Sequence, residues 1–245
     1  MLVVRNLAKS FNGRRILDGF DLTVPNNGFT VLIGPSGCGK STFFDLLMGI
    51  TSMNQGALSW MGRPVADLQQ LAAYMQQRDL LLPWLSLLKN ACLPAELAGV
   101  TARRRTAAAR EIFVKLGLEG FEDYLPALVS GGMRQRCALA RTLMFARDLV
   151  LLDEPLSALD AITRRLLQSH LLRLQTEFAK SILMVTHDVE EALLLADDLL
   201  VLSAAPMRIC ERFRLDLPKP RDIAAPAFVE IKARVLARLE AEARA

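Results

Sequence analysis

Short, uninterrupted apolar runs recur along the chain and dominate its hydrophobic pattern. They are Phe29–Ile33, Leu149–Leu152, Ile182–Thr186 and Leu199–Leu202. A run of this length without polar alternation predicts a strand that is covered on both faces. Helical spacing follows Lys40 as far as Met48, and a second apolar stripe consists of Leu167, Leu171, Leu174 and Phe178. Strands that alternate with helices in this way predict a parallel sheet with helices on both faces.

The N-terminal residues, the middle of the chain and the C-terminal tail have different hydrophobic patterns. At the start, two β-like runs are separated by Asn12-Gly13, which is a turn signal. From Leu80 to Gly120 the chain is rich in Leu and Ala and has helical spacing. The tail from Ala227 predicts an amphipathic helix that carries Phe228, Ile231, Val235 and Leu239. Prolines separate this tail from the sheet, at positions Pro218, Pro220 and Pro226.

Composition narrows the class of protein. Of the 245 residues, 52% are hydrophobic and 23% are charged, which suits a chain with a buried core. The net charge of +4 is small and only 6% of residues are aromatic, so nucleic-acid binding is not expected. The four cysteines lie far apart without CxxC spacing, which argues against zinc and disulfides. No run predicts a membrane span or a secretory signal, so we expect a cytoplasmic protein.

The segment Gly34–Thr42, GPSGCGKST, is the strongest candidate for chemistry. It fits the pattern G-x-x-x-x-G-K-[ST] between a predicted strand and a predicted helix. Its glycines let backbone N–H groups turn inward around phosphates, and the positive end of the helix adds to this attraction. We expect Lys40 to place its charge at the terminal phosphates and Ser41 to ligate Mg²⁺. The sequence therefore predicts a nucleotide-binding site.

Carboxylates and a histidine follow two other predicted strands. Asp153 and Glu154 come directly after a buried run, at the strand end where open α/β sheets bind ligands. We expect Asp153 to reach Mg²⁺ and Glu154 to orient or deprotonate the attacking water. His187 follows the next run and is expected to contact the terminal phosphate and the water. His170, on a predicted helix, is interpreted as a structural, partly packed side chain.

A second glycine-containing helix start, LVSGGMRQR, spans Leu128–Arg136. Alone, it would indicate only an N-capped helix with a flexible glycine pair. With the other motifs, however, the chain resembles the ATP-binding subunits of ABC transporters. The motifs occur in the family's order: GPSGCGKST, Gln76 in YMQQRDLLLPW, VSGGMRQR, LVLLDEP, SALD and THD. The resemblance covers about Leu2 to Leu217.

The resemblance implies a fold and a division of the chain. The fold is an α/β P-loop NTPase (RecA-like) fold: a parallel sheet core with an N-terminal antiparallel β subdomain and an inserted α-helical subdomain. The ATPase domain would occupy residues 1–218, with the helical subdomain at roughly 80–135, and a C-terminal helical tail would occupy 219–245.

The resemblance also assigns roles to residues. Catalytic roles fall on Glu154, His187 and Gln76, and metal contacts on Ser41, Gln76 and Asp153. Nucleotide contacts fall on Phe11, Gly34, Pro35, Ser36, Gly37, Cys38, Gly39, Lys40, Ser41, Thr42, Ser130, Gly131, Gly132, Met133 and Asp160. Two of these depart from the family pattern: Met133 stands where glutamine is usual, and Phe11 where tyrosine is usual. A phenyl ring still stacks on adenine, and Ser130 with the glycine amides is intact, so we expect function to survive.

The family implies Mg²⁺ and ATP as cofactors and a head-to-tail homodimer, or a heterodimer with a similar ATPase, in which Ser130 of one subunit caps the γ-phosphate held by the other. It also implies a separate membrane permease, with DLLLPWLSLL and a partly exposed Trp84 as the docking surface, and a solute-binding protein. The chain would then lie at the cytoplasmic face of a prokaryotic plasma membrane. The LLPW segment resembles importers of nitrate, sulfonates, taurine or thiamine-precursor pyrimidines. The alternative is an ABC ATPase of a lipoprotein-release or cell-division machine.

Overall fold

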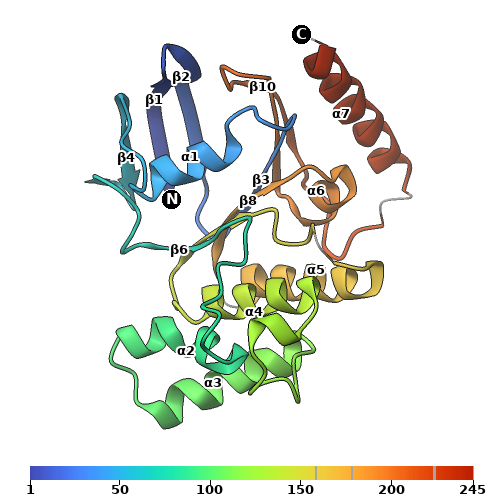
Figure 1. Ribbon diagram of the computed structural model, residues 1–245. Helices are drawn as coiled ribbons and strands as arrows, with labels where there is room; N and C mark the ends of the chain where they lie inside the picture. Colours follow the sequence, from blue (N-terminus) through green and yellow to red (C-terminus); the bar gives the residue numbers. More distant parts are fainter. Residues whose placement is uncertain (158, 178, 223–224, 245) are drawn as a thin grey trace.

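The computed structural model describes residues 1–157, 159–177, 179–222 and 225–244. Two β-sheets and a group of helices make up the chain (Figure 1). The strands are β1 (Leu2–Phe11), β2 (Arg14–Val24), β3 (Phe29–Ile33), β4 (Gln55–Trp60), β5 (Arg63–Val65), β6 (Ala72–Met75), β7 (Leu149–Asp153), β8 (Ser181–Thr186), β9 (Asp198–Leu202) and β10 (Ile209–Arg214). The helices are α1 (Lys40–Leu47), α2 (Leu87–Leu97), α3 (Ala102–Lys115), the 3₁₀ turn η1 (Pro126–Leu128), α4 (Gly131–Leu143), α5 (Ala161–Thr176), α6 (Val189–Leu195) and α7 (Pro226–Arg244).

The central sheet has the strand order β10-β9-β3-β8-β7-β6. Pairing is parallel from β9 to β6, and β10 joins the edge antiparallel to β9. Every residue of β3, β7, β8 and β9 is buried, which explains why these strands read as continuous apolar runs. The predicted parallel sheet is confirmed. Because all its parallel strands end at the same edge, the loops after β3, β7 and β8 lie together there.

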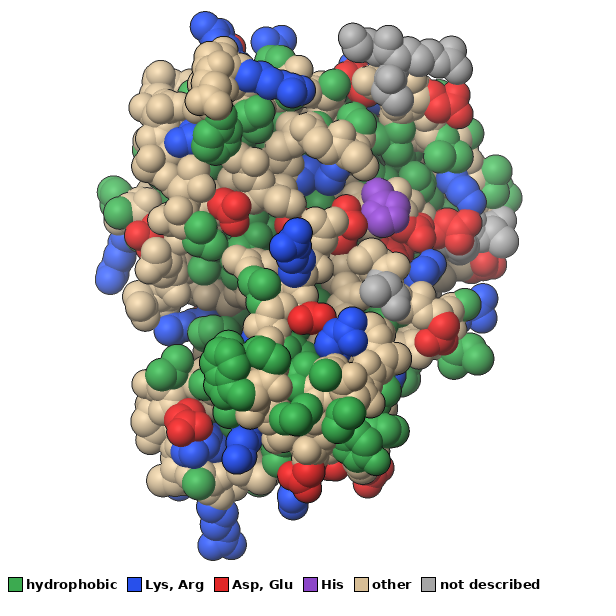
Figure 2. Space-filling view, viewed as in Figure 1, with side chains coloured by type: hydrophobic (Ala, Val, Ile, Leu, Met, Phe, Trp, Pro, Cys, Tyr) green, Lys and Arg blue, Asp and Glu red, His purple; other side chains and the backbone are tan. Residues whose placement is uncertain are grey.

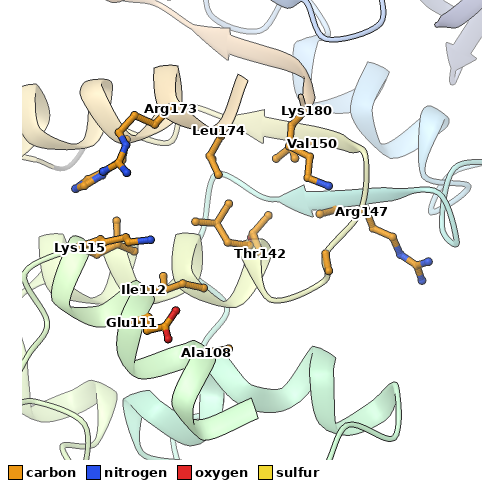
Figure 3. Close-up of a pocket in the computed structure, with 15 residues that line it drawn as sticks. Ala108, Glu111, Ile112, Lys115, Thr142, Arg147, Val150, Arg173, Leu174 and Lys180 are labelled. Atoms are coloured by element: carbon orange, nitrogen blue, oxygen red, sulfur yellow. The ribbon is translucent and has the colours of Figure 1, made fainter. Parts of the chain in front are cut away.

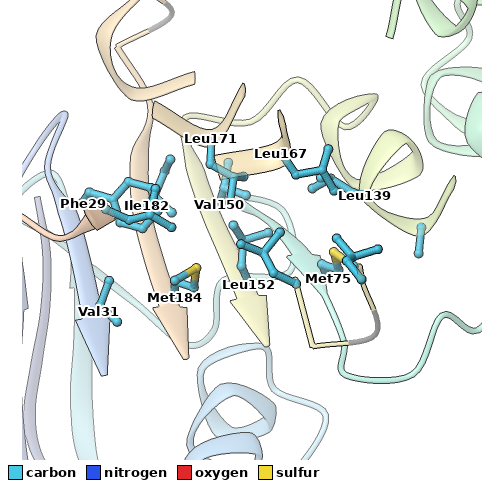
Figure 4. Packing of buried hydrophobic residues seen from close by; sticks show 14 of the residues in the cluster. Phe29, Val31, Met75, Leu139, Val150, Leu152, Leu167, Leu171, Ile182 and Met184 are labelled. Carbon is cyan, nitrogen blue, oxygen red and sulfur yellow. The ribbon is translucent and has the colours of Figure 1, made fainter. Parts of the chain in front are cut away.

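Side chains of these strands alternate between two cores. On one face, Val150, Ile182 and Met184 pack against Leu167 and Leu171 of α5 (Figure 4). On the other face, Leu151, Leu183 and Val185 pack against α1 and the N-terminal sheet. Phe178, the last member of the predicted α5 stripe, lies outside the described residues. The sheet is therefore sandwiched, and burial on both faces fixes the position of the strand ends.

The N-terminal sheet is antiparallel, with the order β2-β1-β4-β5. The predicted turn is present between β1 and β2, where Asn12 and Gly13 both have positive φ, 48° and 80°. This sheet contacts the loop that follows β3, because Ile16 of β2 packs beside Gly39.

The helical segment lies between β6 and β7 and occupies the lower part of Figure 1. Ser86 caps the start of α2, and its hydroxyl accepts a hydrogen bond from the Lys89 amide. Phe113 of α3 is fully buried in the core cluster that also contains residues of α2 and α4. Helix α4 begins at the surface and ends close to the start of β7, so it connects the helical segment to the central sheet.

The C-terminal helix α7 packs on the core instead of extending into solvent. Its buried Phe228 and Val235 belong to the same core cluster as β3 and β8. Arg221, just before it, is nearly buried, and its guanidinium donates to the carbonyl oxygens of Leu193, Ala196 and Leu215. These bonds tie the approach to α7 to the C-terminal end of α6.

Candidate active site

The loop from Gly34 to Thr42 leaves β3 at its carboxyl end and enters α1. A Cβ built at Gly34 would lie 2.8 Å from Cβ of Leu202, so no larger residue fits there without a shift. Gly39 has φ 115°, and its built Cβ would lie 2.7 Å from Cγ2 of Ile16. Backbone geometry and neighbouring strands thus both require glycine. The loop folds tightly over the sheet edge, as a phosphate cradle must.

The start of α1 is suited to an anion. Its N-cap is Gly39, no side chain caps its first amides, and its first turn contains no acidic residue. The Lys40 ammonium is 8% exposed and donates to the carbonyl oxygens of Gly34 and Pro35, each at 2.8 Å. A lysine held inside the loop and uncapped amides at the helix start together form a phosphate-binding arrangement.

Asp153 closes the site from the end of β7. It is 2% exposed, and the hydroxyl of Ser41 donates a hydrogen bond to its carboxylate. Burial raises the pKa of Asp153, and that Ser41 bond opposes the shift. A hydroxyl and a carboxylate, both oxygen donors beside the phosphate loop, match what Mg²⁺ prefers when it bridges a protein and a phosphate. Among the described residues no group of three or more His, Cys, Asp or Glu could hold a metal, so a metal here would need the phosphates as further ligands.

Glu154 is held between the ends of β7 and β8. Its backbone has φ 49°, and its amide donates to the carbonyl of Val185 at 2.9 Å. Its Oε2 lies 3.3 Å from Nδ1 of His187. Its side chain is 17% exposed, so it reaches solvent while its position is constrained. A carboxylate placed beyond Asp153 and oriented by an imidazole can accept a proton from water.

A glutamine also reaches Glu154, and it is Gln77 rather than the predicted Gln76. The amide Nε2 of Gln77 lies 3.3 Å from Oε2 of Glu154. Both residues lie beyond the end of β6 at Met75, so the alternation of a strand no longer fixes which of them faces Glu154. The sequence offers two adjacent glutamines and no local signal that separates them.

Hydrogen bonds and ion pairs with neighbouring residues hold the loop that carries His187. The Thr186 hydroxyl donates to Oε2 of buried Glu191 at 2.7 Å and accepts from the Asp188 amide at 3.0 Å. Arg164 of α5 lies 3.6 Å from Asp188 and 3.7 Å from Glu191. Burial raises the pKa of Glu191, and the Thr186 bond opposes this. Thr186 and Asp188 flank His187 in THD, but no supporting role was predicted for them, and Arg164 and Glu191 belong to none of the motifs.

The second glycine-containing start, at α4, lies on the surface. Ser130 is the N-cap, and its Oγ accepts a hydrogen bond from the Met133 amide at 3.2 Å. No hydrogen bond or ion pair among the described residues joins Ser130–Met133 to the phosphate loop. The connection to the site is indirect: Gln135, one turn further along, donates to the carbonyl of Glu154 at 3.0 Å.

Other predicted nucleotide-contacting residues have varied surroundings. Phe11 ends β1 with a 44% exposed ring, and the Lys9 ammonium lies 4.8 Å from the ring centre. Asp160 caps α5 and accepts from the Thr163 amide at 3.0 Å. Cys38 is buried, burial raises the pKa of its thiol, and its Sγ lies 3.8 Å from Nζ of Lys40. The structure therefore gathers Lys40, Ser41, Asp153, Glu154 and His187, and leaves Phe11, Asp160 and Ser130–Met133 at the surface.

Comparison with known proteins identifies the class. The ABC transporter family matches residues 17–157. An ABC transporter ATP-binding protein of Methanocaldococcus jannaschii, MJ0412, is 40% identical over 98% of this chain and 92% of its own length. The taurine import ATP-binding protein TauB of Escherichia coli K12 is 35% identical over 98% of this chain and 97% of its own. The TauB protein of Rhizobium johnstonii is 38% identical over 91% and 88%.

A solved structure agrees with the sequence relatives. The ATP-binding cassette MJ0796, solved as a dimer in a post-hydrolysis state with ADP and Pi, superposes with a TM-score of 0.81. It is 25% identical and covers 89% of this chain and all of its own. The chain belongs to the ABC transporter family of ATP-binding proteins. It has the P-loop NTPase fold and is an ATPase. No helix in the described part of the chain is long and apolar enough to span a membrane.

Proposed function

We propose that the chain is the ATP-hydrolysing subunit of an importer and that it works as a head-to-tail pair. The observation that carries this is the separation of two phosphate-binding elements within one chain. Lys40, Ser41 and Asp153 lie at the sheet edge, whereas Ser130 starts a helix at the surface without contact to them. In a pair, the α4 start of one copy would cover the nucleotide held by the other. The dimeric, ADP-bound cassette MJ0796 supports this arrangement.

Each residue's role in hydrolysis follows from its place. The amides at the start of α1 and the Lys40 ammonium would hold the phosphates, and Ser41 with Asp153 would hold Mg²⁺. The metal, when bound, offsets the phosphate charge. Glu154 accepts the proton of the attacking water, while His187 and Gln77 orient its carboxylate. Ser130 and the amides that follow it would bind the terminal phosphate from the partner copy.

The loop after Gln77 has the properties of a docking surface for a permease. Trp84 is 71% exposed and Leu80 is 52% exposed. The loop is nevertheless rigidly tied to α4, since Arg141 donates to the carbonyls of Asp79 and Leu80 at 2.6 and 2.8 Å. Hydrophobic side chains gather on this half of the molecule (Figure 2). A fixed apolar surface beside Gln77 can link a membrane partner to the state of the site.

Relatives guide the proposed cargo and location. TauB proteins are named for taurine import and match almost the whole chain. We therefore assign a small sulfonate such as taurine as the solute, ahead of nitrate or a pyrimidine, and an importer ahead of a lipoprotein-release or cell-division machine. The chain would act at the cytoplasmic face of a prokaryotic plasma membrane with a permease and a solute-binding protein.

The pairing is tested by stopping hydrolysis. Glu154→Gln keeps the shape of the side chain and removes the base, so turnover should fall by about 10²- to 10⁴-fold. With MgATP the variant should elute as a dimer in size-exclusion chromatography with light scattering, and as a monomer without nucleotide. The double variant Glu154→Gln/Ser130→Ala should dimerise more weakly at equal ATP occupancy. A Glu154→Gln protein that binds ATP and stays monomeric, with its membrane partner also supplied, would contradict the pairing.

The importer assignment is tested by its partners. The full chain, affinity-purified from membranes of its source cells, should bring down a permease, and the solute-binding protein of that complex should bind taurine in calorimetry. The Trp84→Ala variant should no longer co-purify with the permease, while its ATP binding is unchanged. The Trp60→Ala variant, altered in β4 of the N-terminal sheet, should still co-purify with it. Recovery of a lipoprotein-release or division complex would replace the importer with the alternative function.

A further inference from the structure

A groove lies between the helical segment and the central sheet, away from the candidate active site. Its volume is about 410 Å³, which is within the range of small-molecule sites. Helices α3 and α4 form one wall, and β7 and α5 form the other (Figure 3). It opens beside the residues that precede β7, at the opposite end of that strand from Asp153. The phosphate loop contributes no residue to it.

The floor of the groove is apolar. Val150 and Leu116 are buried, and Ile112, Leu143 and Leu174 are partly buried along its length. A surface of this kind favours a ligand with an aromatic or aliphatic body, because its burial removes apolar area from water.

Cationic side chains lie at both ends of the groove, and one acidic side chain, Glu111, also lines it (Figure 3). Lys115 and Arg173 lie together at one end, whereas Arg147 extends away from the groove (Figure 3). Arg173 already pairs with Glu177 at 2.8 Å, and Lys180 pairs with Asp148 at 3.0 Å. The Lys115 ammonium, by contrast, forms no hydrogen bond or ion pair with any residue that the structure describes. Lys115 therefore lacks a direct bridge and can bind an anion at the mouth, although its charge, after the Arg173 hydrogen bond, also helps to lower the pKa of the nearby Glu177 carboxylate.

A histidine adds one unused polar atom. The His170 imidazole is hydrogen-bonded to the backbone of Lys115, and its Nε2 is buried without a partner among the described residues. Burial lowers the pKa of His170, so the ring is neutral at pH 7. The ring lines the groove, but its Nε2 lies beneath the surface, so the ligand's charge is left to the exposed cation.

We propose that this groove binds a small amphipathic anion, an organic carboxylate or sulfonate with an apolar body, and that Lys115 contacts its charge. The occupant would touch α3 and α4 on one side and α5 and β7 on the other. It would therefore hold the helical segment to the sheet core. The inference is independent of the proposed importer function, since it rests only on the groove.

The probe is 8-anilinonaphthalene-1-sulfonate, which combines a sulfonate, an N–H group and aromatic rings. Its fluorescence is titrated against the full-length protein, with saturating MgATP present to occupy the nucleotide site. We expect one saturable site. Lys115→Ala should weaken binding about tenfold, the size of one hydrogen bond to a charged group. Lys89→Ala, which changes another exposed lysine, on α2, should leave binding unchanged.

A second pair of variants tests the space itself. Ala108 lines the groove and Ala107 does not, and both are exposed on α3. Ala108→Leu should reduce binding at least tenfold, and Ala107→Leu should not, with equal thermal unfolding for both proteins. Hydrogen exchange of the full chain should slow in 102–115 and 161–176 when the probe binds. Binding that MgATP abolishes, or that is equal in Ala108→Leu and Ala107→Leu, overturns the proposal.

Discussion

Two helix starts of similar sequence have very different surroundings in this protein. The start of α1 is enclosed, with Lys40 8% exposed inside its loop and Asp153 opposite. The start of α4 is open, and Ser130 caps only its own helix. A glycine-rich helix start is thus not a site by itself. The first becomes one because β7 and β8 end beside it and bring carboxylates and a histidine, whereas no hydrogen bond or ion pair among the described residues brings a carboxylate or histidine to Ser130–Met133.

The largest effect is expected from substitutions that disrupt one of the two helix starts at a time. Lys40→Ala and Gly131→Asp should each reduce ATP turnover by about 10²-fold or more, because each removes or repels a phosphate contact. A Cβ at Gly131 would lie 3.6 Å from its nearest neighbour, an ordinary contact, so the fold should tolerate the change.

Mixing the two variants shows whether the starts belong to different copies. In a mixed pair, one nucleotide site carries both defects and the other carries none. In a 1:1 mixture that pairs at random, about half of the pairs are mixed, so ATP cross-linking should recover roughly a quarter of the wild-type occupancy in the dimer. If each nucleotide were held within a single copy, the mixture would be as defective as its components.

A smaller effect on kcat is expected from the glutamine that contacts Glu154, beside the start of α1. Gln77→Ala should lower kcat about tenfold, since it removes a contact to the charged Glu154. Gln76→Ala serves as the matched control and should cost much less. ATPase assays of the two purified variants check this, and the reverse order would restore the role predicted for Gln76.

The contacts that support the His187 loop should contribute to the free energy of unfolding and, to a lesser degree, to the rate of ATP hydrolysis. Thr186→Val leaves buried Glu191 without its 2.7 Å bond and should cost about 1–3 kcal/mol of unfolding free energy. Thr30→Val on β3 is the control, because the buried Thr30 hydroxyl has no partner among the described residues. Thermal unfolding should show a lower Tm for Thr186→Val and an unchanged Tm for Thr30→Val. A kcat loss of a few fold should accompany only the first.

The smallest expected effect concerns Asp153 without metal. Because burial raises its pKa, the folded state binds this proton more tightly than the unfolded state does, and the ionised carboxylate destabilises the fold above that pKa. Asp153→Asn should raise Tm at pH 8 by roughly 2–4 °C, the equivalent of about 1 kcal/mol. The gain should shrink as pH falls toward 4. MgATP should no longer stabilise the variant more than ATP alone does, and a lower Tm would contradict the account.

Much of the enclosed site was predictable, since its parts follow recognisable local patterns. The apolar runs predicted β3, β7 and β8, and the residues after each run are those that converge. The two neighbouring glutamines show the limit: the sequence predicted a role for Gln76, which stays a prediction, and gave no sign that Gln77 contacts Glu154. The roles of the nucleotide and metal residues, and the domain bounds at 218 and at roughly 80–135, stay predictions.

The sequence by itself determined the buried parallel sheet, the phosphate loop and the family, because apolar runs and glycine spacing are local properties of the chain. Only the tertiary structure decided that Gln77 meets Glu154, that Arg164 and Glu191 support the His187 loop, that α7 docks on α6, and that a groove separates α3 from α5. Each of these contacts joins elements far apart in the sequence. They depend on strand register and helix packing, which no short pattern of residues encodes.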